Sequence, residues 1–179
     1  MGIILLFAVI GLFLIRTGHR GLVDPILKEI PLGEGLRLKN IHYTQNNPDD
    51  TIKWVLDADE VLFSKDRQRI SFNRFRLKLE IEDSPSVELE GDKGNYNKET
   101  DEINLWGDLR GRAENGYSIS TERITYKQKE GCLKTDDPVR ITGPFFSVAG
   151  RGLFLDLKKE TLRIDSDATT LIEKGSFIL

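Results

Sequence analysis

Length, composition and charge exclude several kinds of protein. The 179 residues are 39% apolar and 31% charged, which suits one domain with one hydrophobic core rather than two. The formal net charge of −3 offers no basic patch for a nucleic acid, so we expect no nucleic-acid partner. The single cysteine, Cys132, excludes an internal disulfide bond.

The first fifteen residues carry no charged side chain and are followed by Arg16. As a helix they span roughly 22 Å, less than the hydrocarbon core of a bilayer at about 30 Å, unless the helix continues and Arg16 snorkels. Basic residues follow the apolar run instead of preceding it, so we expect an uncleaved membrane anchor over residues 1–20, with a signal-peptide core as the alternative. Charge asymmetry alone would place the rest of the chain in the cytoplasm. The expected anchor includes Ile3, Leu6, Ile10, Phe13 and Leu14.

A linker and a first strand are predicted next. Residues 21–35 contain two prolines and alternating charges, a composition typical of an extended linker between an anchor and a domain at 36–179. Alternating apolar residues then predict an edge strand that ends before a polar turn at 45–50. The apolar residues of this strand are Leu36, Leu38, Ile41 and Tyr43.

Four segments of the remaining chain share one pattern, beginning at Leu56, Leu89, Ile119 and Val148, which are 33, 30 and 29 residues apart. In each copy an apolar residue is followed at +2 by a small residue, at +7 by an aromatic residue or Leu, and at +14 by another apolar residue. A period near thirty residues indicates hairpins that bury their apolar faces by stacking. The +2 residues are Ala58, Gly91, Thr121 and Gly150; the +7 residues are Phe63, Tyr96, Tyr126 and Leu155; the +14 residues are Ile70, Ile103, Leu133 and Leu162.

Apolar and polar residues alternate around these positions, most clearly over 75–82, 139–142 and 162–165, which predicts strands with one apolar and one polar face. Polar turns are expected between the +7 and +14 residues of each copy. The step of three from the small residue to the next apolar residue breaks the alternation. We therefore expect a bulge or bend there that turns each strand from one sheet into another.

The chain is expected to close with a last strand at 168–171 and a tail at 177–179. The first and last strands of such a stack have unpaired edges, which are docking sites for another sheet. Thr170 and Leu171 are therefore candidate contacts for a partner at one end, and the four apolar residues of the first strand are candidates at the other.

The sequence predicts no catalytic residue, metal site or cofactor. His19 and His42 have no ligand or triad partner at a suitable spacing. Asp57 and Asp59 would share a strand face, as in a glycosidase, but Asp59 recurs as an acidic residue in later copies, which favours a role at the corner or in solvent. The acidic pairs at 136–137 and at 165 and 167 lack the Gly and Glu of a calcium loop and are expected in turns. No phosphate-binding loop of the Gly-x4-Gly-Lys type is present, so we expect no nucleotide hydrolysis.

The anchor followed by stacked hairpins resembles the LptC family, the membrane-tethered periplasmic component of lipopolysaccharide export. The resemblance covers essentially the whole chain and is also partly shared with the bridge protein LptA. The segments that carry it are Trp54-x-Leu56-x-Ala58-Asp59, Leu89-x-Gly91-Asp92-x-Gly94-x-Tyr96, Ile119-x-Thr121-Glu122-x-Ile124-x-Tyr126 and Thr135-Asp136-Asp137-Pro138-Val139.

This resemblance implies an all-β fold, a twisted open β-jellyroll whose two sheets enclose a lipid-binding groove, preceded by one transmembrane helix. It also implies a single-pass protein of the Gram-negative inner membrane with its C-terminal domain in the periplasm. The implied partners are lipopolysaccharide, the inner-membrane permease subunits of the export ABC transporter at the first-strand end, and LptA at the C-terminal edge.

The residues favour a non-enzymatic lipid conduit whose apolar face receives acyl chains. Two alternatives use the same hairpins: an envelope scaffold with a closed core, and a carbohydrate-active β-repeat enzyme. Alternation alone does not distinguish a lined groove from a filled core. The expected groove residues are Leu56, Phe63, Phe75, Leu77, Leu89, Tyr96, Ile119, Tyr126, Phe146 and Val148.

Overall fold

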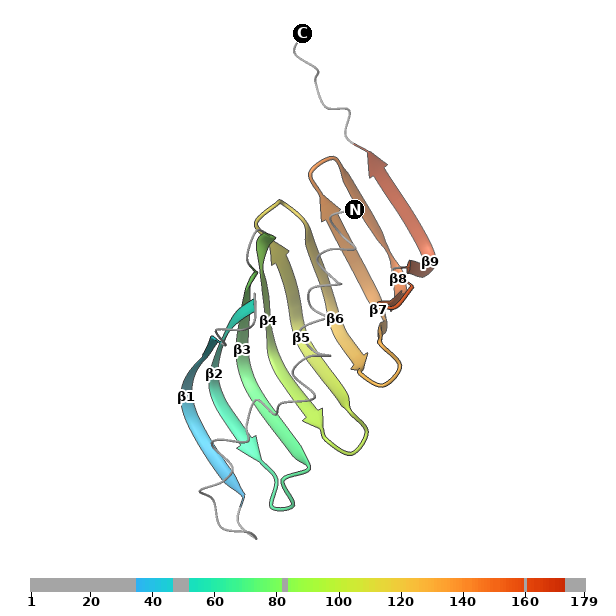
Figure 1. Cartoon of the computed structure of the whole chain (residues 1–179). Coiled ribbons are helices and arrows are strands. Elements are labelled where there is room, and N and C mark those ends of the chain that lie inside the picture. Colours follow the sequence, from blue (N-terminus) through green and yellow to red (C-terminus); the bar gives the residue numbers. More distant parts are fainter. Residues whose placement is uncertain (1–34, 47–51, 82–83, 160, 173–179) are drawn as a thin grey trace.

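The computed structural model describes residues 35–46, 52–81, 84–159 and 161–172, which form one antiparallel sheet with its strands in chain order (Figure 1). Within these ranges, no helix is long and apolar enough to cross a membrane. The expected anchor, residues 21–34 of the linker and the tail at 177–179 lie outside the described residues. The nine strands are β1 (Leu36–Asn46), β2 (Ile52–Phe63), β3 (Arg69–Ile81), β4 (Ser84–Asn97), β5 (Glu102–Ala113), β6 (Ser118–Lys127), β7 (Cys132–Gly143), β8 (Phe146–Asp156) and β9 (Thr161–Ile172).

The predicted hairpins are confirmed, because each strand pairs with its neighbours in the sequence and polar turns join them where they were expected. The ends of the sheet differ from the prediction. The first strand continues through Asn46, into the segment expected to be a turn, and the segments 162–165 and 168–171 belong to a single strand, β9. Asp167 adopts a φ of 54° between those two segments, so β9 bends there without ending.

The repeat corresponds to rows of residues that run across the sheet. The starting residues of the four copies lie in one row, with Leu77 between Leu56 and Leu89, and with Ile141 between Ile119 and Val148. A second row, near the other end of the strands, joins the +7 and +14 residues from Phe63 to Leu162. The stacking inferred from the sequence is therefore confirmed residue by residue.

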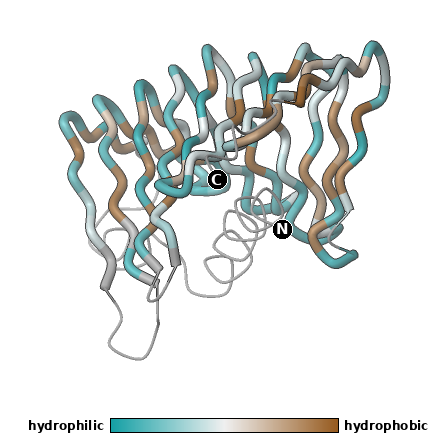
Figure 2. Tube along the Cα trace, turned by 90° about the horizontal axis from the view of Figure 1, so that it is seen from above, coloured by the Kyte–Doolittle hydropathy of each residue, from teal (hydrophilic) through white to brown (hydrophobic). Residues whose placement is uncertain are grey.

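Between the two rows the pairing register shifts, and the sheet bends. Shifts fall between Glu90 and Lys93, between Thr121 and Thr125, and between Ala149 and Arg151, each next to a small +2 residue. Such bulges add a residue to one strand and increase local bending. Seen from above, the sheet is folded rather than flat (Figure 2). The predicted corner is confirmed with a register shift at the last three copies, whereas the pairing of β2 continues past Ala58 without a shift. The two sheets implied by the family are two halves of one continuous sheet.

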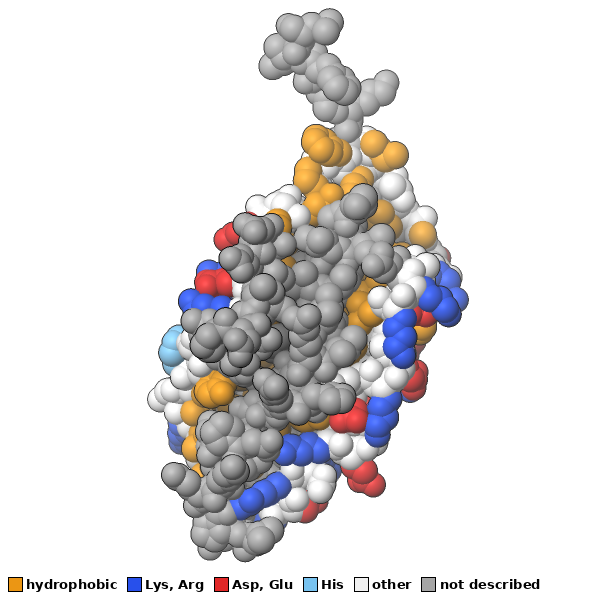
Figure 3. Space-filling model, viewed as in Figure 1, with side chains coloured by type: hydrophobic (Ala, Val, Ile, Leu, Met, Phe, Trp, Pro, Cys, Tyr) orange, Lys and Arg blue, Asp and Glu red, His pale blue; other side chains and the backbone are white. Residues whose placement is uncertain are grey.

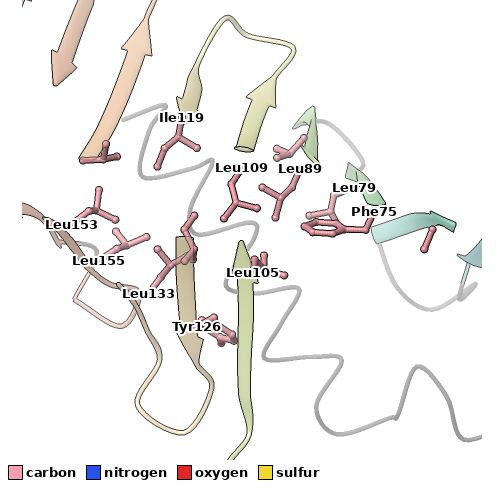
Figure 4. Packing of buried hydrophobic residues seen from close by; sticks show 14 of the residues in the cluster. Phe75, Leu79, Leu89, Leu105, Leu109, Ile119, Tyr126, Leu133, Leu153 and Leu155 are labelled. Atoms are coloured by element: carbon pink, nitrogen blue, oxygen red, sulfur yellow. The ribbon is translucent and has the colours of Figure 1, made fainter. Parts of the chain in front are cut away.

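The hydrophobic core lies on one face of the bent sheet and draws on both halves of the strands. Phe75, Leu79, Leu89, Leu109 and Ile119 come from one half, and Leu105, Tyr126, Leu133, Leu153 and Leu155 from the other; all are buried in one cluster (Figure 4). We call this face, defined by the cluster and the two rows, the apolar face. The opposite face carries the charged side chains of the alternating pattern.

Candidate functional site: the apolar face and its two ends

The ten predicted groove residues all lie on the apolar face. Five of them are buried, namely Phe63, Phe75, Leu89, Ile119 and Tyr126. Leu56, Leu77, Tyr96 and Phe146 are partly buried and pack against the same cluster, and Val148 is half-buried in the row that contains Ile119. The structure thus brings the predicted set together on one face of the sheet.

Several of the most buried residues are absent from the predicted groove set. Leu79, Leu109, Ile141 and Leu153 each have only 1% of their surface exposed. Three of them, Leu79, Leu109 and Ile141, lie in the strands that return between repeat starting positions. The alternation over 75–82 and 139–142 was the signal that could have identified Leu79 and Ile141. Leu153 is the apolar residue three positions after Gly150, so the step of three in the repeat already pointed to it. Leu109 follows a bulge, where the period of two no longer tells which face a residue occupies.

The two edge strands differ in how their apolar residues are placed. In β1, Leu36, Leu38, Ile41 and Tyr43 are half-buried and pack against the core. At the other edge, Leu171 and Ile172 are 65% and 77% exposed. Figure 3 shows apolar side chains gathered at this end, over β7–β9. Thr170 pairs with Val148 and belongs to the apolar face, whereas Leu171 pairs with Ser147 on the opposite face, so the two predicted edge contacts point to different sides of β9.

The two carboxylates considered as an acid–base pair have separate partners. Asp57 pairs with His42, with 2.6 Å between the carboxylate oxygen and Nδ1, and Asp59 pairs with Arg74. Both lie beside an open hollow of about 570 Å³ at the bend, which is lined largely by charged side chains. In the described part of the chain, no group of three or more His, Cys, Asp or Glu is arranged to hold a metal ion.

The charged face is held by ion pairs that link neighbouring strands. Arg76 of β3 lies 2.8 Å from Glu88 and 3.4 Å from Glu90 of β4. Glu80 accepts hydrogen bonds from Lys78 and from Lys53, and these bonds lower the pKa of its carboxyl to about 2. This face therefore keeps its charges in water and leaves the opposite face for apolar contacts.

Two tyrosines of the apolar face, Tyr96 and Tyr126, remain neutral over the physiological range. Burial raises the pKa of Tyr96 to about 12, with the neighbouring Asp101 adding to the effect, and burial raises the pKa of Tyr126 further. The Tyr96 hydroxyl donates a hydrogen bond to Asp101, over 3.2 Å. A neutral apolar face with hydroxyls at its margin is suited to acyl chains rather than to ions.

Comparison with known proteins adds the family to this geometry. The family model described as "Lipopolysaccharide-assembly, LptC-related" matches residues 3–173. No match was found among curated proteins. Among solved structures, the chain is similar to LptH, the LptA homologous periplasmic component of the lipopolysaccharide transport device from Pseudomonas aeruginosa, with 10% identity, a TM-score of 0.36, 80% of this chain covered and 100% of that chain. The sequence match spans nearly the whole chain and is sufficient for assignment: the protein belongs to the LptC-related family of lipopolysaccharide-assembly proteins.

Proposed function

We propose that this chain is a non-enzymatic conduit for lipopolysaccharide, and that its apolar face lines the groove in which the acyl chains lie. The observation that carries the proposal is the continuity of the apolar rows. They cross the sheet from Leu56 in β2 to Val148 in β8 and from Phe63 to Leu162 in β9. A continuous apolar path is what a sliding acyl chain requires.

The energetics of the acyl chain set the requirement for this path. Burial is worth about 0.8 kcal/mol per methylene, so a fourteen-carbon chain that leaves a membrane must recover roughly 11 kcal/mol. An apolar groove offsets that cost at every point along its length, but it gives the lipid no direction. Because the sequence contains no nucleotide-binding loop, direction is supplied by the ATPase of the export transporter in this proposal.

We place the partners at the two edges of the sheet. The inner-membrane permease subunits of the ABC transporter meet β1, and the periplasmic bridge protein LptA meets β9. The unpaired backbone groups of an edge strand are available to a partner strand, and the exposure of Leu171 and Ile172 at β9 supports this assignment. The anchor at residues 1–20 would hold the chain in the inner membrane with the sheet in the periplasm.

One observation favours an envelope scaffold without lipid binding as a second candidate. Leu79, Leu109, Ile141 and Leu153 are almost completely buried, as in a closed core. A scaffold and a conduit therefore make different predictions for the half-buried residues of the rows, which are Leu56, Leu77 and Val148. In a conduit these side chains contact lipid, and in a scaffold they contact only protein.

Photocrosslinking separates the two candidates. The photoreactive residue p-benzoylphenylalanine would replace Leu77 or Val148 on the apolar face, and Lys78 or Ser147 on the charged face, in the full chain expressed in a Gram-negative host. We expect lipopolysaccharide adducts from the first two positions and none from the second two. Equal or absent adducts at all four positions in a folded protein would favour the scaffold.

A further inference from the structure

The two ends of the strands carry different chemistry. Because the strands are antiparallel and in chain order, the turns β2–β3, β4–β5, β6–β7 and β8–β9 all lie at one end. We call this row of turns, at 64–68, 98–101, 128–131 and 157–159, the lysine rim. The turns at 114–117 and 144–145 lie at the other end and form the opposite rim. Since the sheet is bent with its apolar face inward, the two rims border that face on either side.

Every turn of the lysine rim contains lysine. In the view of Figure 3, Lys and Arg side chains follow the lower right border of the molecule, where Figure 1 places these turns. Lys129 lies 3.4 Å from Asp101, and Lys159 lies 3.2 Å from Asp156, so acidic neighbours neutralise both. The other three lysines of the rim are Lys65, Lys98 and Lys158. None of them forms an ion pair with another described residue.

The opposite rim has no basic residue in the turns that the structure describes. Its β7–β8 turn instead exposes Phe145, with 66% of its surface accessible. Leu171 and Ile172 are exposed at the same end of the strands. The described turns of the lysine rim contain six basic and four acidic residues, so an amphiphile on the apolar face meets a net positive charge along this side and apolar or acidic groups along the other.

The position of Lys158 is fixed by the neighbouring turn. A Cβ on Gly131 would lie 3.0 Å from Cε and 3.3 Å from Cγ of Lys158, so the lysine stem lies directly on the β6–β7 turn. Gly131 has a φ of 68°, a conformation that glycine adopts without strain. This packing carries the ammonium group of one turn toward the next, which spreads positive charge between successive hairpins.

Successive turns of the rim are two strands apart, or roughly 10 Å. Lys65 and Lys98 lie on successive turns, whereas Lys158 lies two turns beyond Lys98, roughly 20 Å further along the rim, so a single head group reaches one or two of these lysines at a time. We propose that Lys65, Lys98 and Lys158 bind the phosphate groups of the lipopolysaccharide head, so that the lipid lies with its head toward the lysine rim and its chains on the apolar face. This inference rests on the proposed function, since it assumes that the chains occupy the apolar face.

The test uses the full chain in phosphatidylcholine nanodiscs, with p-benzoylphenylalanine at Val148 to report occupation of the apolar face. Crosslinking would be titrated with diphosphorylated lipid A and with the same lipid lacking both phosphates. The rim variant combines Lys65→Gln, Lys98→Gln and Lys158→Gln. A matched control removes the same charge from exposed lysines of the charged face, with Lys39→Gln, Lys93→Gln and Lys134→Gln.

We expect the rim variant to need about fivefold more diphosphorylated lipid A for half-maximal crosslinking, since one or two surface charge contacts are together worth about that factor. The dephosphorylated lipid should bind the rim variant and the unmodified protein equally. The control variant should need the same concentration of each lipid as the unmodified protein. High salt should reduce the difference. A rim variant that binds diphosphorylated lipid normally, or loses both lipids to the same extent, overturns the inference and leaves the conduit intact. If the protein with its rim lysines intact crosslinks to neither lipid, the proposed function as a lipid conduit is itself overturned.

Discussion

Gly91 and Leu109 pack so closely across neighbouring strands that a Cβ on Gly91 would lie 2.3 Å from Cδ2 of Leu109. The same Cβ would lie 3.0 Å from the ring of Phe75. We therefore expect Gly91→Ala to lower the free energy of unfolding by about 1–3 kcal/mol through overpacking. Denaturant titration of the full chain measures this change. Asp92→Ala, at the exposed neighbour, is the control, and equal stability of the two variants would contradict the tight packing.

A charge on the apolar face should weaken lipid binding. Leu89→Arg places a guanidinium among buried apolar side chains, and Val148→Arg places one where the face is half exposed and the fold tolerates it better. We expect both variants to lose saturable lipopolysaccharide binding, scored by native mass spectrometry, while Lys78→Ala keeps it. Circular dichroism verifies that each variant is folded. Normal binding by Val148→Arg would contradict a lipid path along this row.

Stability should depend on pH through Glu80. Hydrogen bonds from Lys78 and Lys53 lower its pKa from the ordinary value of 4.5 to about 2, so the folded state favours the ionised carboxylate. The stabilisation is present above pH 4.5 and is lost as the pH falls toward 2. In Glu80→Gln this contribution is absent at every pH. The difference in unfolding free energy between the two proteins should therefore shrink over this range, and a constant difference would argue against the assignment.

The thiol of Cys132 should react slowly until the protein unfolds. Its side chain is 4% exposed, and burial together with the neighbouring Glu130 raises the pKa of the thiol. Both effects reduce the fraction of reactive thiolate. We expect dithionitrobenzoate to label the native protein much more slowly than the unfolded protein at pH 8. A second cysteine introduced as Lys134→Cys, on the exposed face, should react at once, and equal rates at the two sites would contradict the burial.

The sequence predicted the repeat because its copies keep the same offsets, and strands at the same offset align in the sheet. That is why the rows through Leu89 and Tyr126 were identified before the structure. The sequence did not predict which face of β9 Thr170 and Leu171 each occupy. The register shift near Ala149 and the bend at Asp167 change which residues of the alternating pattern share a face. The rim of Lys65, Lys98 and Lys158 was also missed, since it exists only once the hairpins are stacked and its lysines occupy different offsets in each copy.

The order of the strands makes the length of the apolar path countable. Each strand contacts chiefly its two neighbours in the chain, from β1 to β9, without a crossover. Inserting or deleting one hairpin therefore changes the path by two strand spacings, roughly 10 Å, and leaves the pairing of the others as it was. Duplication or loss of a single thirty-residue unit would thus lengthen or shorten the apolar face in fixed steps without rebuilding the rest of the sheet.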